Sequence, residues 1–321
     1  MGGEIGFGSG RGGGEPLPWT ASPSLAPRGG VCHDARRSVL IGPFVRPCVM
    51  TAPTILVFDS GLGGLTVYRE IVNARPDARL IYAADDAVFP YGAIEDARLI
   101  DRVIAVMERL IEAHGPDLVV IACNTAATVV LPSLRARFPV PFVGTVPAIK
   151  PACAASSTKR VSVLGTEATV RREYTRALIR EFASGCEIAL VGSARLASLA
   201  EAALDGGPVD EAAIGAEIAP CFIEAGGSRT DTVVLACTHY PLLIDYLARL
   251  APWPVNFIDP APAIARRVVD LVGPAKRRDR VPAQAIFTSG RSPSPALRKT
   301  LESLGLGEVV ALDRLPAAGT I

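Results

Sequence analysis

From Thr54 onward, short runs of consecutive apolar residues alternate with longer stretches in which apolar residues recur every three or four positions. The short runs are apolar throughout, which is typical of strands in a parallel sheet that helices cover on both faces. The longer stretches have the period of helices with one buried face. Strands are predicted over 54–58, 79–84, 117–122, 140–143, 160–164, 187–191, 231–236, 255–258 and 283–287. Helices are predicted over 65–74, 93–113, 126–137, 167–182, 195–204, 210–225, 242–249, 262–272 and 294–304.

This alternation predicts an α/β architecture with right-handed crossovers. The same arrangement occurs twice along the chain. Early in each half a strand ends near a hydroxyl residue, Ser60 or Thr166, and later in each half a strand ends at a cysteine, Cys123 or Cys237. The repetition predicts two pseudo-symmetric domains that face each other, each with a central, mainly parallel sheet flanked by helices.

The domain boundaries are predicted from the positions of prolines and from the length of each segment. Pro147 and Pro151 mark a break, so residues 147–258 are predicted to form the second domain. The last segment is too short for a domain of its own, and we expect 259–321 to join 51–146 in the first. Residues 1–50 are rich in Gly and Pro and have no helical or strand period. They are interpreted as a disordered extension, or as the result of an upstream start with Met50 as the real one.

Composition narrows the classes of function. The 321 residues include 33 Lys and Arg against 32 Asp and Glu, a net charge of +1, which gives no strong attraction to nucleic acid or an anionic membrane. The sequence contains no run of about 18 consecutive apolar residues, so it does not predict a membrane-spanning helix. The seven cysteines are odd in number and sparsely spaced, which favours free thiols in a reducing, cytoplasmic compartment.

Two cysteines carry the candidate chemistry. Cys123 and Cys237 each follow a buried strand, at the edge where open α/β sheets bind ligands. A helix N-terminus at this edge stabilises a thiolate or binds a carboxylate. One such cysteine alone is usually a small buried hydrophobe, but two in matching contexts favour a functional pair. Racemisation at a carbon needs a base on one face and an acid on the other, which two opposed thiols can supply. Cys153, Cys186 and Cys221 lack such flanks and are interpreted as structural.

The chain from about Thr54 to Pro316 resembles the glutamate racemases of bacterial cell-wall synthesis, within the aspartate/glutamate racemase superfamily. The motifs that carry the resemblance are FDSGLGGLTV (58–67), PYG (90–92), ACNTAA (122–127), VLGT (163–166) and ACTHYPLL (236–243). The resemblance implies interconversion of L- and D-glutamate without a cofactor or a metal, and D-glutamate for peptidoglycan. It also implies two α/β domains with the active site in the cleft between them, and a homodimer.

The resemblance also implies roles for particular residues. Cys123 would deprotonate D-glutamate and Cys237 would deprotonate L-glutamate. Asp59 would assist the first thiol and His239 the second. Glu201 matches an acidic position of the family by register only. The substrate-contacting positions would be Asp59, Ser60, Pro90, Tyr91, Gly92, Asn124, Thr125, Thr166, Thr238 and His239. Hydroxyls and backbone N–H groups, rather than an arginine clamp, are expected to hold the two carboxylates.

Several alternatives stay open at this point. A racemase that acts on aspartate or on a hydantoin is hard to distinguish from the sequence. A side chain shorter by one methylene changes the affinity for the pocket by only about 1–3 kcal/mol. A metal-binding or redox module would use Cys123, Cys237 and His239, although Cys-x-His is a poor zinc spacing. A protein that keeps the fold without catalysis is a third alternative. A pyridoxal phosphate enzyme is disfavoured, because none of the four lysines lies in a strand-end motif.

Overall fold

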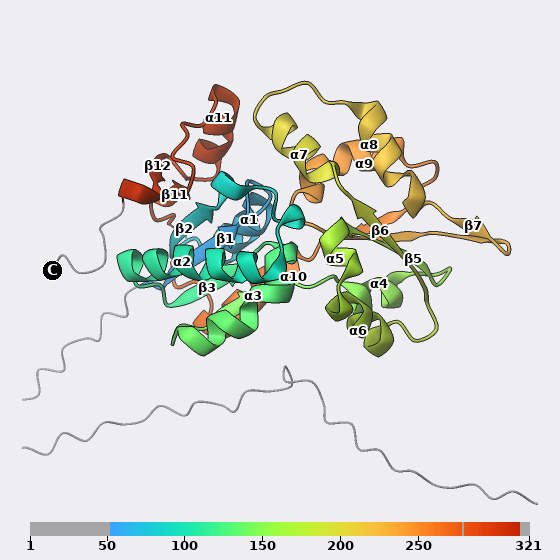
Figure 1. Ribbon diagram of the computed structural model, residues 1–321, viewed down its shortest axis with the longest axis horizontal. Coiled ribbons are helices and arrows are strands. Elements are labelled where there is room, and N and C mark those ends of the chain that lie inside the picture. Colours follow the sequence, from blue (N-terminus) through green and yellow to red (C-terminus); the bar gives the residue numbers. More distant parts are fainter. Residues whose placement is uncertain (1–51, 278, 315–321) are drawn as a thin grey trace, which may run out of the picture. The chain divides into compact units, whose positions relative to one another are not determined.

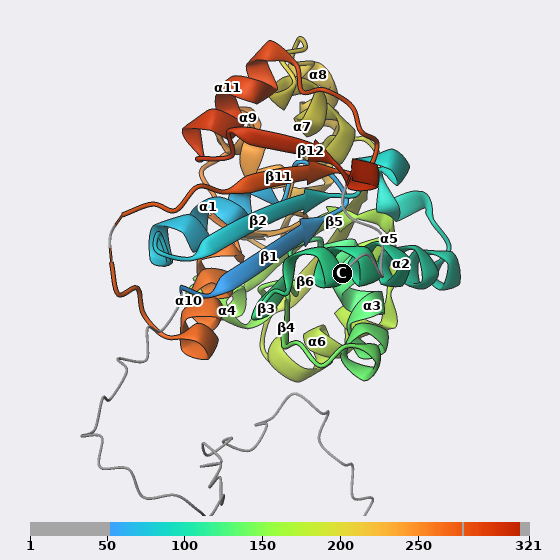
Figure 2. The same cartoon turned by 90° about the vertical axis from the view of Figure 1, so that its left-hand side faces the viewer.

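Two parallel sheets organise the protein, whose computed structural model describes residues 52–277 and 279–314. The first sheet consists of β1 (Thr54–Asp59), β2 (Arg79–Ala84), β3 (Leu118–Ile121), β4 (Phe142–Gly144), β11 (Gln284–Phe287) and β12 (Glu308–Ala311). Its strand order is β12-β11-β2-β1-β3-β4, which can be followed in Figure 2. The second sheet consists of β5 (Arg160–Thr166), β6 (Glu187–Ser193), β9 (Thr232–Ala236) and β10 (Asn256–Ile258), in the order β10-β9-β5-β6. All pairings within both sheets are parallel.

Helices connect the strands and cover the sheets (Figure 1). They are α1 (Leu65–Ala74), α2 (Asp96–His114), α3 (Asn124–Arg137), α4 (Ile149–Ala155), α5 (Glu167–Arg171), α6 (Glu173–Phe182), α7 (Leu196–Leu204), α8 (Glu211–Ile218), α9 (Ile244–Leu250), α10 (Ala261–Val272) and α11 (Pro295–Ser303). Short 3₁₀ turns lie at η1 (Asp86–Val88), η2 (Tyr91–Ala93), η3 (Ala219–Cys221), η4 (Tyr240–Leu243) and η5 (Leu312–Arg314). A small antiparallel hairpin joins β7 (Glu224–Ala225) and β8 (Ser228–Arg229).

The apolar strands result from burial on both faces, as β1 illustrates. Ile55 and Val57 belong to a core cluster with residues of α1, α10 and α11. Leu56 and Phe58 point to the opposite face, into a cluster with residues of α2 and α3. Because successive side chains of a strand point to opposite faces, a strand covered on both faces has no polar alternation. The sequence pattern is therefore a direct record of this double packing.

The α/β fold expected from the sequence is confirmed, and the nine predicted strands are all present with ends within two residues. Two helix predictions are wrong in extent. The helix predicted over 167–182 is interrupted at Arg172, whose backbone is extended. The helix predicted over 210–225 ends as an α-helix at Ile218, because Pro220 cannot continue the hydrogen-bond ladder. The sequence pattern does not predict α4, β12 or the β7–β8 hairpin.

The strands sort by position in the chain. Residues 54–144 and 284–311 supply the first sheet, and residues 160–258 supply the second. The division of the chain into domains of 51–146 plus 259–321 and of 147–258 stays a prediction. The predicted extension over 1–50 lies outside the described residues. Among the residues that the structure describes, no helix is both long and apolar enough to cross a lipid bilayer.

Candidate active site

Both candidate thiols lie where their sheets reverse the direction of winding. In the first sheet the chain places β2 on one side of β1 and β3 on the other, so the carboxyl ends of β1 and β3 flank a crevice. Ser60 follows β1, and Cys123 lies two residues beyond β3. In the second sheet β5 and β9 flank the corresponding crevice, with Thr166 ending β5 and Cys237 directly after β9. Because ligands bind at such points in open α/β sheets, each sheet offers a hydroxyl and a thiol to a binding position.

One cleft receives both thiols. It has a volume of about 290 Å³, part of which is open to solvent, and it is lined by Ser60, Phe89, Pro90, Tyr91, Gly92, Cys123, Asn124, Thr125, Thr166, Ala197, Cys237, Thr238 and His239. Eleven of the twelve site residues expected from the sequence are in this lining, and Asp59 is the exception.

The first thiol belongs to the beginning of a long helix. Cys123 caps α3, and its sulfur accepts a hydrogen bond from the Ala126 amide at 3.5 Å. The thiol also donates to the Ser60 hydroxyl at 3.6 Å. Burial, followed by the negative charge of Asp59, raises the pKa of Cys123 to about 12, although the Ala126 and Ser60 contacts oppose this rise. Cys123 therefore keeps its proton at neutral pH.

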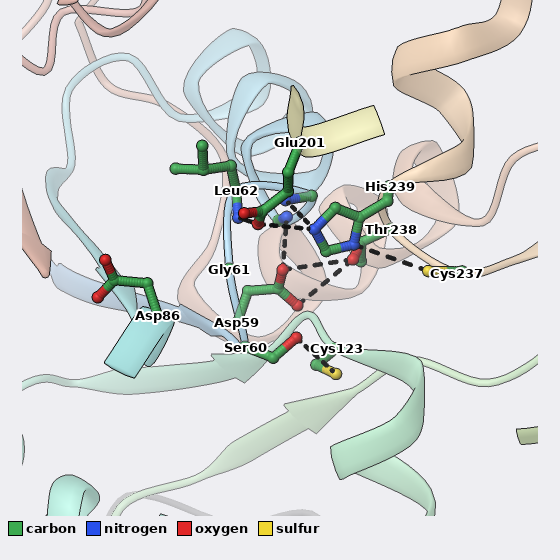
Figure 3. Close-up of polar contacts among 12 residues, drawn as sticks. Asp59, Ser60, Gly61, Leu62, Asp86, Cys123, Glu201, Cys237, Thr238 and His239 are labelled. Carbon is green, nitrogen blue, oxygen red and sulfur yellow. Dashed lines mark hydrogen bonds and ion pairs between the residues drawn. The ribbon is translucent and has the colours of Figure 1, made fainter. Parts of the chain in front are cut away.

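The second thiol has a different environment. Cys237 is followed by the 3₁₀ turn η4, so the helix N-terminus expected at both thiols is present as an α-helix only at Cys123. The Cys237 sulfur lies 3.7 Å from Nδ1 of His239, and Nε2 of the same ring lies 3.0 Å from a carboxylate oxygen of Glu201 (Figure 3). Burial disfavours the charged ring, but the hydrogen bonds to Cys237 and Glu201 outweigh it and raise the pKa of His239 to about 10. His239 is therefore a cation at neutral pH, placed to neutralise a thiolate at Cys237.

Asp59 is fully buried, and its carboxylate contacts the loop that carries Cys237 rather than Cys123 itself. Its carboxylate accepts from the Gly64 amide at 2.9 Å and lies 3.4 Å from the Thr238 hydroxyl. Ser60, not Asp59, is the hydrogen-bond partner of Cys123. Burial raises the pKa of Asp59, and the nearby charge of His239 opposes that rise. Asp59 thus acts on Cys123 through charge rather than through a direct contact.

Glu201, which the sequence indicates only by register, is a central member of the cluster. It lies on α7, contacts His239, and also accepts from the Leu62 amide at 2.6 Å. The close approach requires glycine, because a Cβ atom at Gly61 would overlap the Glu201 carboxylate. One signal in the sequence could have raised its rank: Glu201 is the sole charged residue of LASLAEAAL, the segment that forms α7.

Polar groups suited to carboxylate binding surround the thiols. The hydroxyls of Thr125, from α3, and Thr166, at the end of β5, lie 3.0 Å apart across the cleft. The Asn124 side chain is buried, and neither its amide nitrogen nor its oxygen has a partner among the described residues. Buried polar groups are nearly always hydrogen-bonded, so a ligand in the cleft would supply the missing partner.

These features agree with what the chain is similar to. The Asp/Glu/hydantoin racemase family matches residues 55–268, well over half of the chain, and the chain belongs to this family. It is 54% identical over 256 residues to the glutamate racemase of Brucella anthropi, which covers 78% of this chain and 92% of that protein. It is 53% identical over 265 residues to the glutamate racemase of Brucella ovis, covering 81% and 95% respectively.

A solved structure gives the same result for the fold. The crystal structure of Escherichia coli glutamate racemase in complex with L-glutamate and the activator UDP-MurNAc-Ala aligns with a TM-score of 0.75. The two sequences are 40% identical, and the alignment covers 81% of this chain and 98% of the Escherichia coli chain.

We predict that the His239 ring titrates near pH 10 and stays protonated at neutral pH, because its contacts with Cys237 and Glu201 favour the charged form. Glu201→Gln removes one of these contacts and should lower the pKa of His239. Nuclear magnetic resonance titration of the imidazole protons measures both values, with His239→Gln used to assign the signal. His114 is an internal control, because burial and then Arg79 lower its pKa below the usual 6.5. A wild-type His239 that titrates near 6.5 contradicts the prediction.

Proposed function

We propose that this protein interconverts L- and D-glutamate by moving the proton on the α-carbon between two thiols, without a cofactor. One thiol in its thiolate form removes the α-proton from one face of the substrate. The other thiol donates its proton to the opposite face, which inverts the centre. One C–H bond and one S–H bond are broken and one of each is formed, so the two thiols exchange protonation states in each turnover.

One observation carries this proposal. Cys123 and Cys237 occupy corresponding positions after strands of two different sheets, and both line the same cleft. A single nucleophilic or metal-binding cysteine needs no such duplication, whereas inversion at a carbon needs proton carriers on two sides. The similarity to glutamate racemases of Brucella anthropi and Escherichia coli supports glutamate as the substrate.

The charges around the thiols suggest which direction the ligand-free protein is prepared to catalyse. The raised pKa of Cys123 keeps a proton on that sulfur, and the His239 cation faces Cys237. The raised pKa of Cys123 suits it to act as the acid, and the His239 cation would stabilise a negative charge on Cys237 when that thiol acts as the base. If Cys237 serves L-glutamate, this form is ready for conversion of the L- to the D-enantiomer.

His239 can follow the proton at Cys237 because its ring has two sets of partners. When the ring is charged, Nε2–H donates to Glu201 and Nδ1–H faces the sulfur. When the ring is neutral with its proton on Nδ1, Nε2 can accept from the Gly63 amide, which lies 3.2 Å away. Both charge states therefore have hydrogen-bond partners, which lowers the cost of changing between them.

Substrate binding is assigned to groups that donate hydrogen bonds. The Asn124 amide and the hydroxyls of Ser60, Thr125, Thr166 and Thr238 would hold the two carboxylates, together with the backbone N–H groups of Tyr91 and Gly92. These groups line the cleft and come from both sheets. A homodimer, a cytoplasmic location and a supply of D-glutamate for peptidoglycan belong to the same proposal.

The direct test is a polarimetric or circular-dichroism assay of the purified protein without added cofactor. We predict that the optical signal decays to zero from either L-glutamate or D-glutamate, because both reactions end at the same equal mixture of the two enantiomers. L-aspartate should be converted far less efficiently. Efficient racemisation of aspartate with no conversion of glutamate would assign the site to another substrate of the family, and no conversion of either would contradict the proposal.

Replacing either candidate thiol should abolish racemisation. We predict that Cys123→Ser and Cys237→Ser each lower the rate by at least about a hundredfold, because each removes a general acid/base. Cys153→Ser and Cys221→Ser are matched controls, since both thiols are buried but lie outside the cleft lining. Circular dichroism checks that each variant folds. A near-native rate in either of the first two variants would show that one thiol suffices.

A further inference from the structure

Asp85 lies directly after β2, next to the site but outside the cleft lining. Its side chain is fully buried, and its backbone N–H donates to the Asp59 carbonyl at 2.9 Å. Three side chains donate to its carboxylate. Tyr91 does so at 2.6 Å, the Thr288 hydroxyl at 2.7 Å, and Arg102 through two of its nitrogens. No step of the proposed reaction uses this carboxylate, so its dense bonding calls for an explanation.

The three donors come from separate parts of the fold. Arg102 belongs to α2, Thr288 directly follows β11, and Tyr91 begins the turn η2. Arg102 and Thr288 approach the carboxylate on Oδ1, and Arg102 and Tyr91 approach it on Oδ2. Two well-packed elements therefore fix the orientation of Asp85, and the carboxylate cannot turn to follow Tyr91. Tyr91 must instead take the position that Asp85 dictates.

Tyr91 is the link between this anchor and the cleft. Tyr91 lines the cleft together with Pro90 and Gly92, and it is almost fully buried. Burial, and then the charge of Asp85, raise the pKa of Tyr91 well above its usual value, so the phenol remains a donor. Gly92 faces Thr166 of the second sheet, since a Cβ atom there would lie 3.6 Å from the Thr166 Cβ atom. The turn is thus held at one end by Asp85 and faces the opposite wall of the cleft at the other.

We propose that Asp85 is a positioning residue for substrate binding: through the Tyr91 hydroxyl it fixes the turn at the depth where the backbone N–H groups of Tyr91 and Gly92 meet a substrate carboxylate. This inference rests on the proposed function. It assigns Asp85 no contact with the substrate and no part in proton transfer. The charged pair with Arg102 and the Thr288 bond serve to immobilise the carboxylate that holds Tyr91.

The first test is kinetic and uses Tyr91→Phe, which keeps the ring and deletes only the hydroxyl. Losing one hydrogen bond to a charged partner should raise the KM for glutamate at least about tenfold. The kcat should stay near the wild-type value, because the contact serves the ground state and the transition state alike. Partial unfolding would instead lower kcat at constant KM. Asp85→Asn should raise KM as well, and the double variant should be no worse than Asp85→Asn alone, since both act on one contact.

The chain offers a matched control for each change. Tyr68→Phe removes the hydroxyl of another buried tyrosine, one that has no partner among the described residues. Asp77→Asn disrupts another buried carboxylate paired with an arginine, Arg75, at 2.9 Å, away from the cleft lining. Both controls should leave KM and kcat unchanged even if they lower stability. An unchanged KM in Tyr91→Phe, or an equal rise in the controls, overturns the inference.

A second measurement does not depend on the reaction. Hydrogen–deuterium exchange of the peptide covering residues 89–94 should be faster in Asp85→Asn than in the wild type and in Asp77→Asn. The amides of Ala93 and Ile94, which donate to the Pro90 and Tyr91 carbonyls, report on this turn. If the wild-type protein fails to racemise glutamate, the proposed function falls, and this exchange still decides the role of Asp85. Equal exchange rates in the wild type, Asp85→Asn and Asp77→Asn would overturn the positioning role of Asp85.

Discussion

Residues 61–64 follow β1 and contact Glu201 of α7 and the loop after β9 that carries His239, and three of these positions, all glycine, leave no space for a side chain. A Cβ atom at Gly61 would overlap the Glu201 carboxylate, and one at Gly63 would come within 2.6 Å of the Thr238 hydroxyl. This close approach lets the Leu62 amide bind Glu201 and lets the Thr66 hydroxyl bind the Thr238 carbonyl at 3.2 Å. Larger residues here would separate the loop of Cys237 from the crevice of Cys123. The glycine-rich turn is therefore the steric condition for a shared cleft.

Burial gives the site its electrostatic character. Asp59, Cys123 and His239 are each 5% exposed or less, so their charges interact with little screening by water. The result is unequal thiols in similar positions: a protonated Cys123 beside a carboxylate, and a Cys237 beside a cation. In the proposed reaction, the fold would supply the symmetry that inversion needs, and the side chains would supply the difference that orders the proton transfers. The catalytic roles of these residues remain the proposal that the geometry supports.

The repeated pattern of strands was readable from the sequence because both faces of each sheet are buried. What the sequence concealed depends on tertiary contacts. The break at Arg172 is an example: its guanidinium binds the Thr125 carbonyl, the Thr128 hydroxyl and Asp96, so a contact with α2 and α3 overrides the local helical period. The sequence does not indicate α4, because Pro151 predicts a break, although proline is tolerated in the first turn of a helix.

The candidate site likewise has a part that the sequence predicts and a part that depends on tertiary contacts. The two thiols and their neighbours could be found because they recur in matching motifs, and eleven of the expected residues do line one cleft. Glu201 and Asp85 could not be ranked in this way. Glu201 acts through His239, which follows β9, and Asp85 is held by Arg102 of α2 and by Thr288 after β11. Such partners become visible only when the chain is folded.

The central claim is that two different thiols serve opposite faces of one carbon. Racemisation of L-glutamate in deuterium oxide, stopped in the first few per cent of conversion, tests it most directly by mass spectrometry of the separated enantiomers. The account predicts that the D-glutamate formed carries deuterium at the α-carbon while the remaining L-glutamate retains its hydrogen. Equal deuterium in both enantiomers at this stage, or retention of hydrogen in the product, would indicate a single base and contradict the account.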